Sequence, residues 1–262
     1  MTRDRYINTS LSKALTLLDL FCSEQSRYTL TEIARACGTQ PGTVYPIVYT
    51  LEKHGYLIRE KETKTYHLGL KVLAHANRVL SDLDIRDQAR PVLRKLSSEL
   101  VCNAHLAIPY NEEVLYLDRE EAAPSVVVAS VIGWRAPLYC TALGKIFLAF
   151  CPELEDHLMA SEKALTPVTP NTITNLEVLA HEIRGIRESG YSYDREEFHL
   201  GHTCMAAPVR DYRDEVIAAI SISNATSRFE YEPREKFLRA VIDGAWQISR
   251  SLGCCRRRPL AV

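Results

Sequence analysis

The sequence lacks the features that are typical of membrane, secreted and zinc-binding proteins. No stretch of the 262 residues approaches the roughly 20 apolar residues that a membrane-spanning helix needs. The first ten residues are polar and contain no apolar segment of a secretory signal. Eight cysteines are scattered along the chain, and none forms a CxxC pair. We therefore expect a cytoplasmic protein with reduced thiols, no metal and no cofactor.

A strong net charge is also missing, because the formal charge at pH 7 is -1. The charge is nevertheless uneven along the chain. Residues 1–80 hold 11 Lys and Arg against 7 Asp and Glu (+4), whereas residues 81–262 hold 21 against 26 (-5). A basic N-terminal part attracts phosphate groups, and an acidic remainder disfavours binding elsewhere. The imbalance is modest, and it supports DNA binding only together with the motif that lies in the basic part.

That motif is a helix-turn-helix followed by a two-stranded wing. Thr29 and Glu32 have the spacing of a capping box, which predicts a helix from about residue 30, and Gly38 supplies the turn after it. A second helix begins near residue 40, and its apolar residues recur at helical spacing: Val44, Ile47, Val48 and Leu51. Two short strands at 56–59 and 65–68 then predict the wing.

The outer face of the second helix is polar and could contact the major groove of DNA. A merely solvated face is the alternative, but the wing, the capping box and the basic excess together favour DNA binding. Pro46 lies inside this helix, four residues after Gly42, so we expect a loosened helix start. The candidate DNA-contacting residues are Arg35, Gly42, Thr43, Tyr45, Pro46, Tyr49, Thr50, Lys53, Lys61 and Lys64.

The segments on either side of this motif are less distinctive. Ser10 or Ser12 could cap a helix that ends near Phe21, with Leu11, Leu15, Leu18 and Phe21 as its buried face. Arg3 and Arg5 belong either to a solvated terminus, which we favour, or to an arm that contacts DNA. After the wing, residues 70–80 predict a connecting helix, and residues 83–100 predict another that Pro91 interrupts.

From residue 102 onward, short apolar strands and amphipathic helices follow one another without strict alternation. This order predicts an α+β domain around one central sheet. The expected strands are 105–108, 114–117, 126–129, 191–193, 204–209 and 216–223. The expected helices are 141–150, 152–158, 176–189 and 235–252.

Ser221 and Ser223 alternate with Ile220 and Ile222, so strand periodicity puts the two serines on one face. Two hydroxyls on an apolar strand suit a small-molecule pocket, although serines bonded to neighbouring backbone would look the same. A cluster of Asp, Glu, His and Cys at 194–204 permits two further interpretations, a metal site and a catalytic cysteine. Its spacing matches no common zinc site, and a Cys204 nucleophile with His202 as base lacks a clear oxyanion hole.

With these patterns assembled, the chain resembles the IclR family of bacterial and archaeal transcription regulators over residues 11–253. The N-terminal motifs that carry the resemblance are residues 30–34, Gly38, 43–44, 51–57 and 66–69. The C-terminal motifs are 137–138, 141–145, 190–191, Asp194, 196–197, Gly201, Cys204, 206–209 and 221–223. His202 departs from the family pattern, which usually has an apolar residue there, and Pro46 stands where a basic residue is common.

The resemblance implies a winged helix-turn-helix at 1–69, a linker helix at 70–83 and a GAF-like effector domain at 84–253 with a central antiparallel sheet flanked by helices. Residues 254–262 form a tail to which we assign no function. It also implies a homodimer or dimer of dimers on double-stranded operator DNA and a small organic-acid or aromatic effector. The implied effector-binding residues are Leu138, Thr141, Ala142, Asp194, Cys204, Ser221 and Ser223.

We therefore expect a transcriptional regulator that is controlled by an effector, and not an enzyme. Of the two directions of control, we favour a repressor over an activator. The alternative is a metabolite-binding enzyme with Cys204 as nucleophile and a vestigial helix-turn-helix. The reactivity of the Cys204 thiol separates the two, because a catalytic cysteine needs a lowered thiol pKa.

Overall fold

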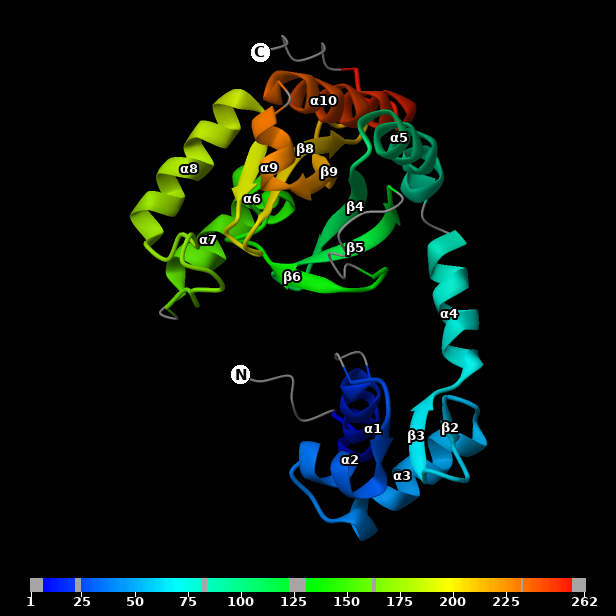
Figure 1. Ribbon diagram of the computed structural model, residues 1–262. Helices are drawn as coiled ribbons and strands as arrows, with labels where there is room; N and C mark the ends of the chain where they lie inside the picture. The colour runs from blue at the N-terminus through cyan, green and yellow to red at the C-terminus, as the bar shows by residue number, and fades with distance from the viewer. Residues whose placement is uncertain are drawn as a thin grey trace. The chain divides into compact units, whose positions relative to one another are not determined.

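The computed structural model describes residues 7–21, 25–81, 84–122, 131–161, 164–231 and 233–255. The chain divides into two compact units, Met1–Leu83 and Asp84–Val262 (Figure 1). Three expectations lie outside the described residues: the arm with Arg3 and Arg5, the strand at 126–129, and the arginines of the tail at 256–258.

The first unit is a winged helix-turn-helix with a small antiparallel sheet. Its helices are α1 (Thr9–Leu20), α2 (Leu30–Ala36), α3 (Pro41–Lys53) and α4 (Leu70–Ser81). Its strands are β1 (Tyr28–Thr29), β2 (Leu57–Arg59) and β3 (Thr65–Leu68), and they pair in the order β1-β3-β2. β2 and β3 form the expected wing. β1 has only two residues, too few for a periodic signal in the sequence.

The capping box and the glycine turn are both confirmed. The Thr29 hydroxyl accepts a hydrogen bond from the Glu32 amide, and the Glu32 carboxylate accepts one from the Thr29 amide at 2.7 Å. Gly38 has φ of +61°, a conformation that costs glycine little. Val44 and Val48 are buried, and Ile47 and Leu51 pack against the same core, so α3 presents its apolar stripe inward as expected.

The expected cap of α1 is wrong, and its expected buried face is confirmed only at its C-terminal end, where Phe21 is buried and Leu18 packs against the core. Asn8 caps the helix, because its side-chain oxygen accepts a hydrogen bond from the Leu11 amide. Leu17 is the buried residue of this helix, whereas Leu11 and Leu15 are 59% and 55% exposed. The N-terminal part of the expected stripe therefore faces outward, while its C-terminal end packs inward together with Leu17.

The second unit is built on a six-stranded antiparallel sheet in the order β6-β5-β4-β9-β8-β7. The strands are β4 (Asn103–Tyr110), β5 (Glu113–Glu120), β6 (Arg135–Pro137), β7 (Ser192–Arg195), β8 (His202–Arg210) and β9 (Val216–Ala225). The helices are α5 (Asp84–Leu100), α6 (Ala142–Phe150), α7 (Pro152–Ala160), α8 (Leu176–Ser189), α9 (Thr226–Tyr231) and α10 (Arg234–Ser251). Of these, β6 and α9 were not expected from the sequence.

Helices cover both faces of this sheet (Figure 1). α5 and α10 pack on one face, where Gly244 lets α10 approach closely, because a Cβ there would lie 2.9 Å from Val92 of α5 and 3.3 Å from Ile220 of β9. α6 packs on the other face against β8 and β9, and α8 packs against α6. Alternation along β9 therefore directs Ile220 toward α10 and Ser221 toward α6.

The expected interruption at Pro91 is wrong, because α5 continues through it from Asp84 to Leu100. Pro91 and Asp87 are both exposed. The Asp87 carbonyl, which loses its helical donor to proline, is therefore open to water, and the helix tolerates the residue.

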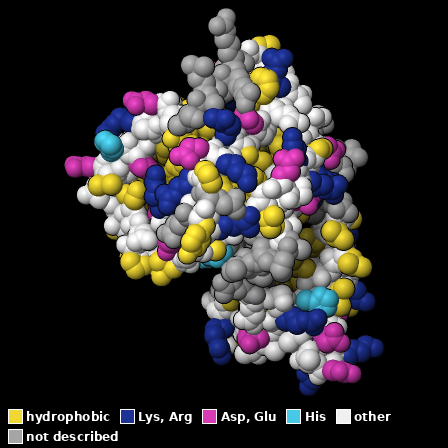
Figure 2. Space-filling view, turned by 45° about the horizontal axis from the view of Figure 1, so that its top comes forward, with side chains coloured by type: hydrophobic (Ala, Val, Ile, Leu, Met, Phe, Trp, Pro, Cys, Tyr) yellow, Lys and Arg dark blue, Asp and Glu magenta, His cyan; other side chains and the backbone are white. Residues whose placement is uncertain are grey.

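In the part of the chain that the structure describes, no helix combines the length and apolar character needed to cross a membrane. Figure 2 shows Lys and Arg side chains interspersed with acidic and hydrophobic ones over the visible face of the larger unit.

Candidate functional site

The proposed DNA-contacting residues lie on the surface of the first unit. All ten are exposed, including the seven on α3 and the two wing lysines. Tyr45 and Tyr49 are 48% and 45% exposed, and their ring centres lie 6.0 Å apart. The face therefore offers two adjacent aromatic rings to a partner.

Polar groups surround these rings. Lys53 Nζ lies 5.6 Å from the centre of the Tyr49 ring. The Thr50 hydroxyl donates a hydrogen bond of 2.7 Å to the Pro46 carbonyl. The helix continues through Pro46 to Lys53. Since hydroxyls, rings and methyl groups outnumber cations on this face, its chemistry suits base edges better than phosphates.

In the second unit, a small cavity lies between the start of α6 and the polar face of the sheet. It is lined by His105, Tyr116, Trp134, Thr141, Ala142, Leu143, Asp194, Phe198, His199, His202, Cys204, Ser221 and Ser223. Six of the seven proposed effector-binding residues are among them, and Leu138 is not. The free volume is about 30 Å³, which has room for a water molecule or two. A metabolite can enter only if side chains move.

Leu138 has a different position from the one proposed. It is buried, and a Cβ added at Gly144 would lie 2.3 Å from its carbonyl oxygen. The chain before α6 thus packs directly on the first turn of the helix. Leu138 supports the helix start that lines the cavity, instead of lining the cavity itself.

Two buried polar atoms of the cavity have no hydrogen-bond partner in the described residues. These are Ser223 Oγ and His202 Nδ1. Ser221 Oγ lies 3.5 Å from His105 Nδ1, at the limit of a hydrogen bond. Burying an unpaired polar group costs about 1–3 kcal/mol, so these atoms are suited to a polar ligand.

The start of α6 adds backbone donors to the cavity. The Thr141 hydroxyl accepts a hydrogen bond from the Gly144 amide at 3.0 Å and donates one to the Pro137 carbonyl at 2.9 Å. The structure shows no acceptor for the amides of Ala142 and Leu143 within the described residues. Free amides and the positive end of the helix dipole favour an anion.

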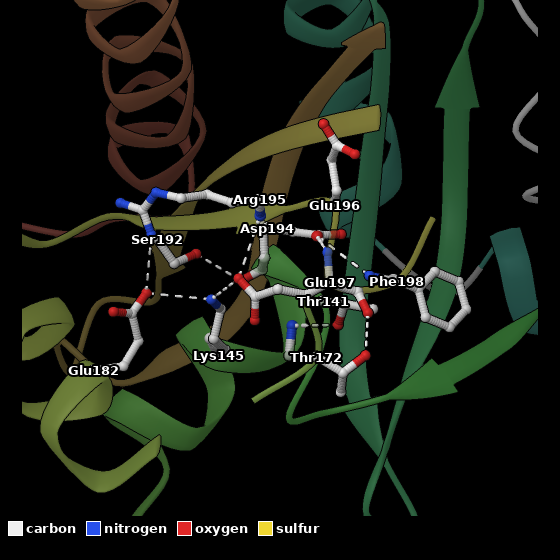
Figure 3. Close-up of polar contacts among 12 residues, drawn as sticks. Thr141, Lys145, Thr172, Glu182, Ser192, Asp194, Arg195, Glu196, Glu197 and Phe198 are labelled. Atoms are coloured by element: carbon white, nitrogen blue, oxygen red, sulfur yellow. Dashed lines mark hydrogen bonds and ion pairs between the residues drawn. The ribbon is translucent and has the colours of Figure 1, made fainter. Parts of the chain in front are cut away.

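A buried lysine lies one turn further along α6. Lys145 is fully buried, and its Nζ donates to Glu197 Oε1 at 2.7 Å and to Glu182 Oε1 at 3.2 Å (Figure 3). Glu197 is itself buried. This ion pair fixes the loop after β7 against α6, since the Glu197 amide also donates to Asp194 Oδ1 at 2.7 Å.

Asp194 is the acidic residue of the cavity, and its carboxyl holds its proton more tightly than usual. Burial raises the pKa of Asp194 to about 7, opposed by hydrogen bonds from the Glu197 and Phe198 amides and by Lys145. Burial, helped by the neighbouring Asp194 carboxyl, raises the pKa of the Cys204 thiol well above its ordinary value. This is the opposite of an activated cysteine, so the catalytic alternative gains no support.

Aromatic side chains form the remaining walls. The Tyr116 and Trp134 rings lie 5.3 Å apart, and Trp134 and Phe198 lie 5.6 Å apart. Burial also lowers the pKa of His105 to about 4, so this ring is neutral at pH 7. No pattern in the sequence assigned these four residues to a cavity. Only Tyr116 and His105 carried a signal, as members of expected strands.

The histidines, cysteine and acids of this region form no group of three or more that could hold a metal ion, within the residues that the structure describes. Among the thirteen described residues that line the cavity, none is lysine or arginine. An anion would therefore be held by amides, hydroxyls and imidazole N–H groups.

Two family models match the chain. The model described as "Bacterial transcriptional regulator IclR C-terminal" matches residues 77–250, and the one described as "IclR helix-turn-helix domain" matches residues 10–61. Together they cover both units.

Individual relatives agree. The HTH-type transcriptional regulator XynR of Escherichia coli is 32% identical over 93% of this chain and 97% of its own length. The DNA-binding transcriptional repressor YiaJ of the same bacterium is 30% identical over 97% of this chain and 91% of its own length. The crystal structure of the Thermotoga maritima IclR superposes with a TM-score of 0.74 at 33% identity, over 93% of this chain and 98% of that chain.

Proposed function

The chain belongs to the IclR family of transcriptional regulators, and on that premise we propose that it is a metabolite-controlled repressor. In this proposal α3 contacts operator DNA, and a small organic acid or aromatic metabolite enters the cavity at the start of α6. YiaJ, which carries the name of a repressor, supports the direction of control.

The pair of unpartnered buried atoms in the cavity carries the effector part of the proposal. Among the residues that the structure describes, Ser223 Oγ and His202 Nδ1 have no hydrogen-bond partner, and both residues line the same space as the first amides of α6. A carboxylate would accept hydrogen bonds from these amides and hydroxyls. Its body would lie against Tyr116, Trp134 or Phe198.

Protonation of Asp194 assists an anionic ligand. With a pKa of about 7, its carboxyl can carry a proton and donate a hydrogen bond to a bound carboxylate. A ligand carboxylate beside a charged Asp194 would instead be repelled.

The exposed face of α3 supports the DNA part of the proposal. Tyr45, Tyr49, Thr43 and Thr50 would contact bases and sugars, while Arg35, Lys53, Lys61 and Lys64 would contact phosphates. Four phosphate contacts per protomer would give a salt slope of about -3.6, at about -0.9 for each contact.

We include a homodimer, or a dimer of dimers, in this proposal. Leu11 and Leu15 of α1 are four residues apart and each more than half exposed, and Ile7, just before the helix, is exposed to the same degree. Such a stripe suits packing against a second copy. Two recognition helices on one duplex would read half-sites about 34–36 Å apart.

Fluorescence anisotropy with labelled DNA from upstream of the gene tests the DNA part. Specific binding should exceed binding to a scrambled duplex and weaken steeply as salt rises. Tyr49→Ala should lower specific affinity about tenfold, the equivalent of about 1.4 kcal/mol. Ser98→Ala, an exposed serine of α5, serves as the matched control. Equal affinity for both duplexes would refute the proposal.

A thermal-shift screen of small carboxylates, followed by anisotropy with any hit, tests the effector part. The double variant Ser221→Ala with Ser223→Ala should bind DNA normally but need about tenfold more ligand for release. If the double variant responded like the unmodified protein, the cavity would not be the effector site.

A further inference from the structure

One residue of the cavity, His202, is polar where the family pattern usually has an apolar side chain. Its ring lines the cavity, and its Nδ1 atom is buried without a hydrogen-bond partner among the described residues. A buried polar atom that lacks a partner destabilises the folded chain, and an apolar residue would avoid this cost. His202 is therefore a candidate for direct contact with a ligand.

The pairing of the strands sets the order of the polar side chains along the cavity. Cys204 of β8 lies opposite Asp194 of β7 and opposite Ser223 of β9. Since alternate residues of a strand share a face, His202 lies on the same face as Cys204, about 7 Å nearer the start of β8. Asp194 and Ser223 are buried, whereas His199, whose carbonyl accepts from the His202 amide at 3.2 Å, is exposed. The two histidines therefore form the outer end of the cavity.

Helix α6 and strand β8 run in the same direction past this cavity. The first residue of each, Ala142 and His202, lines the cavity, and the last residue of each, Phe150 and Arg210, lines a separate cleft at the far end of α6. The first amides of a helix point back beyond its start, so those of α6 point toward the start of β8. A ligand whose carboxylate binds these amides would therefore extend its other end toward His202.

Charges near His202 restrict what that other end can be. The Glu196 carboxylate accepts a hydrogen bond from the Gly201 amide at 2.9 Å, which lowers its pKa, and the nearby His202 lowers it further. Glu196 is therefore charged at pH 7. Burial, together with His202, lowers the pKa of His199, so this ring adds no compensating charge at neutral pH. None of the described residues that line the cavity is lysine or arginine, so a second carboxylate would be repelled there, whereas a neutral oxygen would not.

A hydroxyl is the neutral oxygen group that suits the His202 ring best. In a neutral imidazole, Nδ1 is a donor in one tautomer and an acceptor in the other, and in the protonated ring it is a donor. A hydroxyl both donates and accepts, so it can pair with Nδ1 in each of these forms. A carbonyl oxygen can only accept. The position therefore favours a hydroxyl group over a keto group.

From this geometry we propose that His202 determines the specificity of the cavity, and that the effector is a carboxylate with a hydroxyl group at its opposite end. The carboxylate contacts the first amides of α6 and Ser223, and the hydroxyl pairs with His202 Nδ1. A plain monocarboxylate leaves His202 unpaired, and a dicarboxylate brings its second charge near Glu196. This inference rests on the proposed function, because it assigns a class of ligand to the same cavity.

Two matched sets of acids test this selectivity: pentanoate, 5-hydroxypentanoate and glutarate, and benzoate, 4-hydroxybenzoate and terephthalate. Each acid is titrated into a Trp246→Phe protein, in which Trp134 of the cavity is the remaining tryptophan and its fluorescence reports binding. In at least one set, the hydroxy acid should bind at least about tenfold more tightly than both the plain acid and the diacid.

Variants of the same protein test the roles of His202 and Glu196. His202→Leu should abolish the preference for the hydroxy acid and leave the affinity for the plain acid within about twofold. His202→Gln, which keeps polar atoms at this position, should retain part of the preference. Glu196→Gln should strengthen binding of the diacid about threefold and leave the hydroxy acid unchanged. His181→Leu, at an exposed histidine of α8 outside the cavity, is the matched control and should change none of these affinities.

The ligand-free protein provides an independent measurement. His202→Leu removes an unpaired buried atom, so it should raise the melting temperature by about 2–4 °C. A lowered melting temperature would show that His202 already has a partner in the folded chain and would overturn the proposal.

The titrations separate this proposal from the proposed function. Equal binding of the hydroxy acid and the plain acid, or an unchanged preference in His202→Leu, would overturn the role of His202 while the cavity remained a carboxylate site. If none of the six acids bound, the proposed carboxylate site itself would be refuted, and the ligand class with it.

Discussion

Helices α3 and α6 differ in how much of their surface is buried. α3 buries only Val44 and Val48 and exposes a polar and aromatic face, so each outer residue is free to meet a partner. α6 buries eight of its nine residues, and its two ends open on different cavities. A surface helix acts through its own side chains. A buried helix acts through the packing and charges around it, so it can transmit a change but tolerates few substitutions.

The two lysines of these helices should give the largest contrast. Lys145→Ala leaves the buried Glu197 without its cation and should lower the free energy of unfolding by about 3–5 kcal/mol. Urea unfolding followed by tryptophan fluorescence measures this, since both tryptophans lie in the second unit.

Lys53→Ala, on the exposed end of α3, is the matched control and should change stability by less than about 0.5 kcal/mol. Lys145→Met with Glu197→Gln, which removes both charges, should recover much of the loss. If Lys145→Ala lowered the free energy of unfolding by less than about 1 kcal/mol, water would reach Glu197. In that case α6 would not be the buried helix that the comparison with α3 assumes.

Two glycines give the next largest effect. Gly144→Ala puts a Cβ at 2.3 Å from the Leu138 carbonyl and should destabilise the second unit by about 1–3 kcal/mol. Gly42→Ala meets nothing within 4 Å in α3 and should stabilise the first unit by about 0.5–1 kcal/mol.

Circular dichroism during urea unfolding measures both glycine variants, with fluorescence reporting the second unit separately. The essential result is that Gly144→Ala lowers the free energy of unfolding while Gly42→Ala raises it. The same sign in both helices would show that the close approach of Leu138 to α6 is not maintained in solution.

The pH dependence of stability should show the cost of the buried acid beside α6. The pKa of Asp194 is about 7 in the folded chain and 3.8 by its ordinary value, so the folded chain holds this proton more tightly. Its contribution to stability is fully present below pH 4 and is lost as pH rises toward 7, at about 1.4 kcal/mol per pH unit.

Asp194→Asn should remove this dependence, so its stability relative to the unmodified protein should rise between pH 4 and 7 and level off above. Urea unfolding of both proteins across this range measures the difference, and other acids cancel in the comparison. A constant difference would place the Asp194 pKa near its ordinary value.

The smallest expected effect concerns the helix caps. Thr141 caps α6 through its hydroxyl, whereas Gln40 at the start of α3 makes no side-chain cap. Thr141→Ala should cost about 1 kcal/mol, and Gln40→Ser should gain about 0.5 kcal/mol. Thermal unfolding of the two variants checks both values. No gain from Gln40→Ser would indicate that water already satisfies the first amides of α3.

Local signals in the sequence were sufficient for much of the first unit. The capping box at Thr29, the glycine turn at Gly38 and the apolar stripe of α3 each depend on residues within one or two turns. The orientation of α1 was not predictable in the same way. Leu11 and Leu15 have helical spacing equal to that of any buried stripe, and only packing against α2 and α3 leaves them exposed while Leu17, Leu18 and Phe21 face the core.

In the second unit, too, some features followed from local sequence signals and others only from packing. Strand alternation alone put Ser221 and Ser223 on one face, and the structure brings them to the cavity with Cys204 and Asp194. Leu138 does not line that cavity, because Gly144 lets its backbone pack beneath the helix start. The aromatic walls come from three separate segments, and no local pattern relates Trp134 to Phe198.

The sequence by itself determined the class of the protein and its elements, because helix periodicity, capping and family motifs are properties of neighbouring residues. Only the tertiary structure decided what is buried, what is charged and what is left unpaired. The raised pKa of Asp194, the sealed pair of Lys145 and Glu197 and the two cavities at the ends of α6 arise from segments far apart in the chain. Their energies depend on dielectric surroundings and on close packing, and both exist only after the sheet and its helices have assembled.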